Sequence, residues 1–123
     1  MESDAPDVSY GVDLPADVLA GDVRYDEKYL LIHIVEKNKW LVVSRRLRYH
    51  SRIYDAWREE QVASRTYNEY GGGILEIDGA GGVRTFGSSG GFGPVQELDR
   101  VRKCLETTTL RIKTVEATDY IRD

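Results

Sequence analysis

The chain has 123 residues, of which 41% are hydrophobic and 31% are charged, and its formal net charge is −4 at pH 7. A chain of this size and composition is expected to form one compact domain with a modest core. Because it has one cysteine and two histidines, the sequence excludes a disulfide scaffold and a tetrahedral zinc site made of cysteine and histidine.

Hydropathy bears on the cellular location of the protein, and the distribution of charge bears on what it could bind. No apolar run approaches the roughly 20 residues of a membrane span, and the first ten residues lack the apolar core of a secretory signal. We therefore expect a cytoplasmic protein with no membrane partner. Residues 1–27 hold eight acidic residues and one arginine, whereas residues 37–58 hold seven lysines and arginines and one acidic residue. That basic block is either an anion site or a solvated strand face.

The first eleven residues are expected to form a disordered acidic tail, and residues 12–123 a single domain. The tail has too little apolar surface around Pro6 and Gly11 to offset the entropy of ordering it. Residues 12–19 regain apolar character around a proline, which allows a short edge strand or an extended segment.

Residues 28–36 predict the strongest strand, because their nearly continuous apolar and β-branched character suits a strand covered on both faces. A tight polar break follows at residues 37–39, and residues 40–44 then predict the returning strand of a hairpin. Residues 51–64 contain neither glycine nor proline and carry Ile53, Ala56 and Trp57 at helical spacing, which predicts the first helix.

The second half of the chain predicts another hairpin, a helix and a last strand. Residues 67–70 lead into the triplet Gly71-Gly72-Gly73, and residues 74–78 and 83–86 predict two short strands joined by a glycine-rich turn. A second helix is predicted from Pro94 to about Thr107, since proline suits a first helical turn and apolar residues follow every three or four positions.

Residues 109–115 alternate apolar and basic side chains, as a half-exposed strand does, and residues 119–123 are expected to be a short tail. These elements predict the α+β class, with a mixed, mostly antiparallel sheet of about six strands flanked by two helices.

Ten of the twelve glycines lie between Gly71 and Gly93. The densest stretch, residues 87–94, is expected to connect a strand to the start of the second helix. Its glycines allow several backbone N–H groups to face one point, and a helix N-terminus adds partial positive charge, so the stretch is a candidate phosphate cradle. The alternative is a simple connecting loop. It lacks the ending of a Walker loop and the spacing of a dinucleotide fingerprint.

The two histidines have different settings in the sequence. His33 lies in the middle of a predicted strand beside apolar residues, which favours a buried or half-buried structural role. His50 lies within the basic block, where a strand region ends and a helix begins, so its imidazole is a candidate acid, base or nucleophile toward a bound anion. An exposed histidine capping the helix is the alternative. Cys104 lies late in the second helix and is interpreted as a packed or surface thiol.

Four segments of the sequence form a recognisable set. They are Lys28-Tyr29-Leu30-Leu31-Ile32, Tyr49-His50-Ser51-Arg52-Ile53-Tyr54-Asp55, Gly71-Gly72-Gly73 and Phe86-Gly87-Ser88-Ser89-Gly90-Gly91-Phe92-Gly93-Pro94. Together they resemble the janus/ocnus family, which includes the phosphohistidine phosphatases. The segments occur in the family's order, and the resemblance covers about residues 12 to 115. The histidine segment combined with the glycine loop is fairly specific, whereas each piece alone is weak.

The resemblance implies a hydrolase that removes phosphate from phosphohistidine in proteins, with no metal and no other cofactor. It implies that His50 is catalytic, as general base or nucleophile, and that Lys28, Ser89, Gly90 and Gly91 bind the substrate. The implied partners are phosphohistidine-containing proteins and phosphate. The acidic net charge argues against a nucleic-acid partner, and a monomer is expected because no exposed heptad or long apolar stripe indicates assembly.

Three departures from the family pattern bear on these expectations. Ile74 follows the glycine triplet where family members often carry a basic residue, so one helper to the phosphate is missing unless Arg45, Arg46 or Arg48 replaces it. His33 stands where the family often has arginine. Gly90 and Gly91 are smaller than usual in the loop. The main alternative is therefore a module that binds phosphohistidine or another phosphoprotein without cleaving it.

Overall fold

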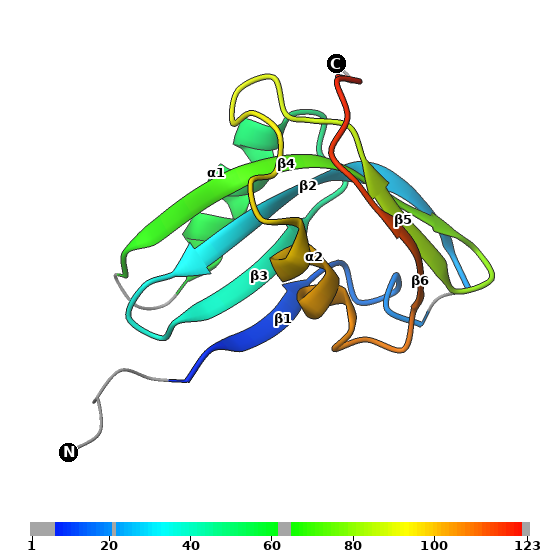
Figure 1. Ribbon diagram of the computed structural model, residues 1–123, viewed down its shortest axis with the longest axis horizontal. Helices are drawn as coiled ribbons and strands as arrows, with labels where there is room; N and C mark the ends of the chain where they lie inside the picture. Colours follow the sequence, from blue (N-terminus) through cyan, green and yellow to red (C-terminus); the bar gives the residue numbers. More distant parts are fainter. Residues whose placement is uncertain (1–6, 21, 62–64, 122–123) are drawn as a thin grey trace.

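The computed structural model describes residues 7–20, 22–61 and 65–121. The elements in chain order are β1 (Ser9–Asp13), β2 (Arg24–Ile34), β3 (Lys39–Ser44), α1 (His50–Glu60), β4 (Tyr67–Asp78), β5 (Gly82–Phe86), α2 (Leu98–Leu105) and β6 (Arg111–Val115). Six strands form one curled sheet in the order β1-β3-β2-β4-β5-β6 (Figure 1). The predicted α+β class, with a mixed sheet of about six strands and two helices, is confirmed.

The middle of the sheet is antiparallel and its two edges are parallel. β2 pairs with β3 and with β4 in antiparallel register, and β4 pairs with β5 in the same way. β1 joins β3 in parallel at one edge, and β6 joins β5 in parallel at the other. The hairpin predicted around residues 37–39 is therefore confirmed, and it brings β2 to the centre of the sheet.

Each face of the sheet is covered by one helix, because successive side chains of a strand point to opposite faces (Figure 1). On β2, Tyr29 belongs to the core beneath α2, where it shares a buried cluster with Leu105. Its neighbour Leu30 belongs to the core beneath α1, with Ile53 and Trp57. All five side chains are fully buried. Residues of β2 on the α1 face therefore lie beneath the start of α1.

Two strands are longer than the sequence predicts. β2 begins at Arg24 rather than Lys28, because its first residues alternate between exposed and buried and lack the continuous apolar run. The glycine triplet lies inside β4, which is one continuous strand from Tyr67 to Asp78. α1 runs from His50 to Glu60, and residues 62–64 of the predicted helix lie outside the described residues.

The predicted N-terminal tail is too long. Ser9, Tyr10 and Gly11 belong to β1, where pairing with Lys39, Trp40 and Leu41 orders them. The pairing partner lies far along the chain, so local composition gives no sign of it. Residues 1–6 of the predicted tail lie outside the described residues.

The predicted start of the second helix is wrong. α2 begins at Leu98, whereas Pro94 forms a bridge with Gly72 and Val95 packs into the core ahead of the helix. The apolar spacing that starts at Val95 therefore includes one core residue that precedes the helix, and the helix itself is shorter than predicted. Tyr120 and Ile121 of the predicted C-terminal tail pack on the fold, because Ser88 N–H donates to the Tyr120 carbonyl oxygen and Ser88 forms a bridge with Ile121. Residues 122–123 of that tail lie outside the described residues.

Candidate functional site

A cavity of about 210 Å³ lies where β2, the start of α1, the glycine loop of residues 87–94 and the C-terminal segment meet. The residues lining it are Lys28, Tyr49, His50, Ser51, Ser89, Gly90, Gly91, Phe92 and Ile121. All five site residues nominated from the sequence are among them. The yellow loop, the upper end of α1 and the red C-terminal segment meet at the top of Figure 1. Segments distant in sequence thus share one cavity.

His50 is the first residue of α1, directly after the extended N-cap Tyr49. Its side chain is only 6% exposed, so the alternative of an exposed capping histidine is wrong. Its Nε2 lies 3.0 Å from the carbonyl oxygen of Gly73 in β4. A carbonyl only accepts hydrogen bonds, so Nε2 carries the hydrogen and the neutral ring keeps its lone pair on Nδ1.

The protonation of His50 is also set by its surroundings. Burial lowers the pKa of His50 below its ordinary value of 6.5, and the positive charge of Lys28 lowers it further, whereas the hydrogen bond to Gly73 opposes both effects. A neutral imidazole at physiological pH has the form that a general base or a nucleophile requires.

The glycine triplet leaves room for the His50 imidazole beside β4. A Cβ atom on Gly72 would lie 2.4 Å from the carbonyl oxygen of Tyr29 and 2.9 Å from Cδ2 of His50. Glycine therefore allows β4 to approach both β2 and the ring. Neither this contact nor the Gly73 carbonyl was assigned a role from the sequence. The signal was present as three successive glycines, which suit a close backbone approach inside a strand.

Lys28 lies in β2 on the α1 face, two residues before Leu30. Its side chain is 6% exposed, and its charge acts on His50. Among the described residues that line the cavity, Lys28 is the one lysine or arginine. A buried ammonium group beside a cavity is a strong local attraction for an anion.

The amides of the glycine loop differ from the arrangement expected for them. Ser89 N–H donates to the carbonyl oxygen of Gly93 at 3.2 Å, so this amide is already used within the loop. Phe92 N–H donates to the Ser89 hydroxyl oxygen at 3.0 Å. The amides of Gly90 and Gly91 donate to no residue that the structure describes, and both glycines line the cavity. These two amides are the loop's available donors.

The helix N-terminus at the cavity belongs to α1 and not to the second helix. His50 and Ser51 occupy the first turn of α1, where backbone N–H groups have no partner inside the helix. The positive end of the α1 dipole therefore faces the cavity. The expected contribution of the second helix is wrong, because α2 starts only at Leu98.

The basic block does not supply a second cation to the cavity. Arg45 Nη2 lies 2.9 Å from Asp13 and 2.7 Å from Glu60, and Arg46 Nη2 lies 2.8 Å from Asp17. These arginines therefore tie the basic block to acidic residues of the fold. Ile74, which directly follows the glycine triplet, is fully buried and supplies no charge to the cavity.

His33 and Cys104 have the settings expected of structural residues. His33 Nε2 lies 2.8 Å from Oδ1 of Asn38, and its ring stacks on Trp40 with 4.3 Å between ring centroids. The Cys104 thiol is buried and donates to the carbonyl oxygen of Trp40. Burial raises the pKa of Cys104 to about 11, which disfavours the reactive thiolate.

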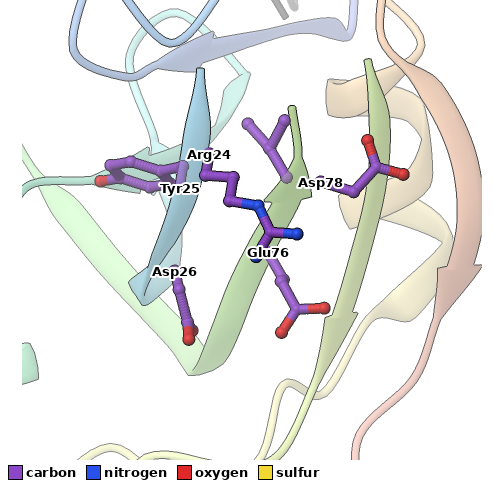
Figure 2. Close-up of a pocket in the computed structure, with 6 residues that line it drawn as sticks. Arg24, Tyr25, Asp26, Glu76 and Asp78 are labelled. Carbon is purple, nitrogen blue, oxygen red and sulfur yellow. The ribbon is translucent and has the colours of Figure 1, made fainter. Parts of the chain in front are cut away.

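A second cavity, of about 270 Å³, lies over β2 and β4 at the end of these strands remote from His50. Figure 2 shows Arg24 reaching toward Glu76 while Tyr25 points away. Two carboxylates that line this second cavity form ion pairs with basic side chains of the sheet: Glu76 pairs with Arg84, and Asp78 pairs with Lys113. These contacts hold adjacent strands together, so the smaller cavity is the candidate site.

The described residues hold neither a membrane-spanning helix nor a metal-binding cluster, and one family matches the chain. Within residues 7–20, 22–61 and 65–121, no helix has the length and apolar character to cross a membrane, and no three histidine, cysteine or acidic side chains cluster as a metal site. The family model described as Janus/Ocnus family matches residues 20–112. A search of curated proteins found no match.

Proposed function

The chain belongs to the Janus/Ocnus family, and on that basis we propose that it is a protein phosphohistidine phosphatase. Such an enzyme hydrolyses the N–P bond of phosphohistidine to histidine and inorganic phosphate, here without a metal. The observation that carries the proposal is the meeting of His50, Lys28 and the Gly90 and Gly91 amides at one cavity. The phosphatase assignment itself comes from the family resemblance.

The proposed substrate complex places the phosphoryl group between the loop and Lys28. The amides of Gly90 and Gly91 donate to its oxygens, and the ammonium group of Lys28 balances its charge. The first turn of α1 adds partial positive charge on the same side. Phosphoryl transfer needs little covalent chemistry from the protein, so positioning and charge stabilisation supply most of the rate.

In the proposed reaction, Nδ1 of His50 takes a proton from a water molecule while the oxygen of that water attacks phosphorus. The N–P bond breaks, and the proton ends on the departing imidazole nitrogen, leaving histidine and phosphate. Alternatively, Nδ1 itself attacks phosphorus as the N–P bond of the substrate breaks, and the departing imidazole nitrogen takes a proton from solvent. A water molecule then cleaves the new Nδ1–P bond, which restores His50 and releases phosphate. A phosphorylated His50 trapped by rapid quenching without acid supports the second route, and its absence supports the first.

A pair of histidine variants tests the proposal. His50→Gln keeps a group that hydrogen bonds to Gly73 but removes the base or nucleophile, so we expect hydrolysis of a phosphohistidine peptide to fall by about a hundredfold or more. His33→Gln is the matched control, and it should keep most of the activity because His33 lies outside the cavity. Unchanged turnover in folded His50→Gln would contradict the assignment of His50.

A binding module for phosphohistidine proteins is the second candidate, and the burial of Ile74 favours it. That position supplies no cation to the cavity, so charge stabilisation during N–P cleavage rests on Lys28. Phosphate release measured beside binding of the same phosphohistidine peptide separates the two candidates. Binding without release identifies the module, and release with turnover identifies the enzyme.

The proposal includes a cytoplasmic, monomeric protein whose partners are phosphohistidine-containing proteins. Nucleic acid is a poor partner for a chain of net charge −4, because affinity for nucleic acid depends on cations that neutralise successive phosphates. The ion pairs of Arg45 and Arg46 with acidic residues weaken the case further. Absence of oligonucleotide binding at low salt is the expected result.

A further inference from the structure

The C-terminal segment of residues 116–121 lies along the glycine loop. Ser88 N–H donates to the carbonyl oxygen of Tyr120 at 2.9 Å, and Ser88 forms a bridge with Ile121. These contacts use main-chain atoms at Ser88 and Tyr120, so they do not depend on the Ile121 side chain. The segment therefore continues alongside the loop as far as the cavity.

Gly87 lets this segment approach closely. Its φ is +73°, and a Cβ atom there would lie 2.8 Å from the carbonyl oxygen of Tyr120. Gly87 N–H also donates to the Thr118 hydroxyl oxygen at 2.9 Å. The C-terminal segment is thus held on the side of the loop by several backbone contacts.

The Ile121 side chain forms an apolar wall of the cavity. It lines the cavity and is 53% exposed. Its Cγ2 atom is 3.7 Å from the place where a Cβ atom on Gly90 would lie. Tyr49, which is 48% exposed, lines the same cavity from the start of α1. Exposed apolar groups therefore stand beside a charged and polar interior.

We infer that Ile121 determines sequence specificity by contacting an apolar side chain next to the phosphohistidine of the substrate protein. This inference rests on the proposed function of the cavity. A phosphoryl group held by Lys28 and the loop leaves the neighbouring residues of its polypeptide at the mouth, beside Ile121. An apolar neighbour loses water-exposed surface there, whereas a charged neighbour loses hydration without gaining a partner from Ile121.

The test compares two phosphohistidine peptides that differ in one residue beside the phosphohistidine, leucine in one and aspartate in the other. Inorganic phosphoramidate, which has no neighbouring residues, is the small substrate. The full chain is compared with Ile121→Ser and with the control Val35→Ser. Val35 is another exposed apolar residue, 41% exposed, but it does not line the cavity.

The wild-type chain is expected to prefer the leucine peptide, and Ile121→Ser to lower kcat/KM for that peptide by about tenfold, the usual effect of losing an apolar contact. The loss on phosphoramidate in the same variant should be smaller than the loss on the leucine peptide, and Val35→Ser should match wild type on all three substrates. Equal rates for both peptides in wild type, or equal losses on both in Ile121→Ser, would overturn the inference.

Binding of the same two peptides carrying a non-hydrolysable phosphonate in place of the phosphoryl group separates this inference from the proposed function. If wild type binds the leucine analogue more tightly and Ile121→Ser loses that preference, while no peptide is hydrolysed, Ile121 determines specificity and the phosphatase proposal fails. If hydrolysis occurs but neither Kd nor kcat/KM depends on the neighbouring residue, the phosphatase proposal stands and the inference fails. Absence of both binding and hydrolysis overturns both.

Discussion

At the scale of single residues, two neighbours fix the chemical state of His50. The Gly73 carbonyl selects the tautomer that keeps the lone pair on Nδ1, and burial with the nearby Lys28 charge keeps the ring neutral to lower pH than usual. The same ammonium group therefore serves two purposes in the proposed enzyme. It attracts the phosphoryl group, and it keeps the imidazole unprotonated.

The titration of His50 tests this coupling without any substrate. In wild type, the imidazole C–H signals of His50 should titrate in NMR spectra with a midpoint below pH 6.5, because its pKa is lowered in the folded protein. Lys28→Met removes a positive charge that disfavours the imidazolium ion, so the midpoint should move to higher pH. Lys37→Met, in the exposed turn between β2 and β3, should leave it unchanged. A midpoint that stays or falls in Lys28→Met would contradict the coupling.

At the scale of elements, one arginine connects β3 to β1 and α1. Arg45 follows β3, donates to the Asp13 carbonyl and carboxylate in β1, and pairs with Glu60 at the end of α1. The other oxygen of the Asp13 carboxylate accepts a hydrogen bond from Nε1 of Trp57 in α1 at 3.1 Å. The position of α1, and hence of the imidazole at its first residue, depends partly on this network.

Replacing this arginine tests whether its role is structural. Because the Arg45 side chain is 16% exposed, Arg45→Met should lower the free energy of unfolding in urea by about 1–2 kcal/mol. Arg46→Met is the control, since the Arg46–Asp17 pair is about half exposed and should contribute less to stability than the Arg45 contacts. Equal stability of the two variants would contradict the network. If folded Arg45→Met lost phosphate binding, Arg45 would take part in binding the phosphate and its role would not be purely structural.

The elements also show which sequence signals are sufficient. The β2–β3 hairpin and the core face of α1 could be predicted because Ile53 and Trp57 keep a helical period and residues 28–36 form a nearly continuous apolar run. The start of α2 could not, since the buried Val95, which lies before the helix, continues the period of Leu98 and Val101. Residues 9–11 join β1 through pairing with β3, which local composition does not encode.

The candidate site could be predicted in part. Lys28, His50 and the loop were identifiable by their residue types and by the family resemblance, and they line one cavity. The Gly73 carbonyl and the wall formed by Ile121 were not, because a main-chain acceptor and an apolar residue near the end of the chain have no distinctive sequence pattern. They become visible only when the strands and the C-terminal segment are placed side by side.

At the scale of the whole molecule, one sheet separates two hydrophobic cores, which differ in whether they support the helix that carries His50. The core beneath α1 holds the helix that carries His50, whereas the core beneath α2 lies on the opposite face. Both cores share the β2 backbone, so we expect them to unfold together. A truncation in one core should nevertheless affect the cavity differently from a truncation in the other.

Matched truncations in the two cores test this separation. Ile53 and Leu105 are both fully buried, so Ile53→Ala and Leu105→Ala should each lower the free energy of unfolding by about 2–5 kcal/mol, in a single transition. At a temperature where both variants stay folded, Ile53→Ala should also reduce kcat/KM for a phosphohistidine peptide, since Ile53 lies one turn after His50. Equal kcat/KM values in the two folded variants would contradict the separation.

The available N–H groups of Gly90 and Gly91 belong to the polypeptide backbone. Every coded amino acid except proline retains that donor, so alanine scanning of the loop would pass over the atoms proposed to hold the phosphate. Exchanging a single amide for an ester linkage by chemical synthesis deletes one donor and leaves the side chains as they are. Whether a chain with a different loop sequence can hold the same oxyanion is therefore decided by backbone conformation rather than by residue identity.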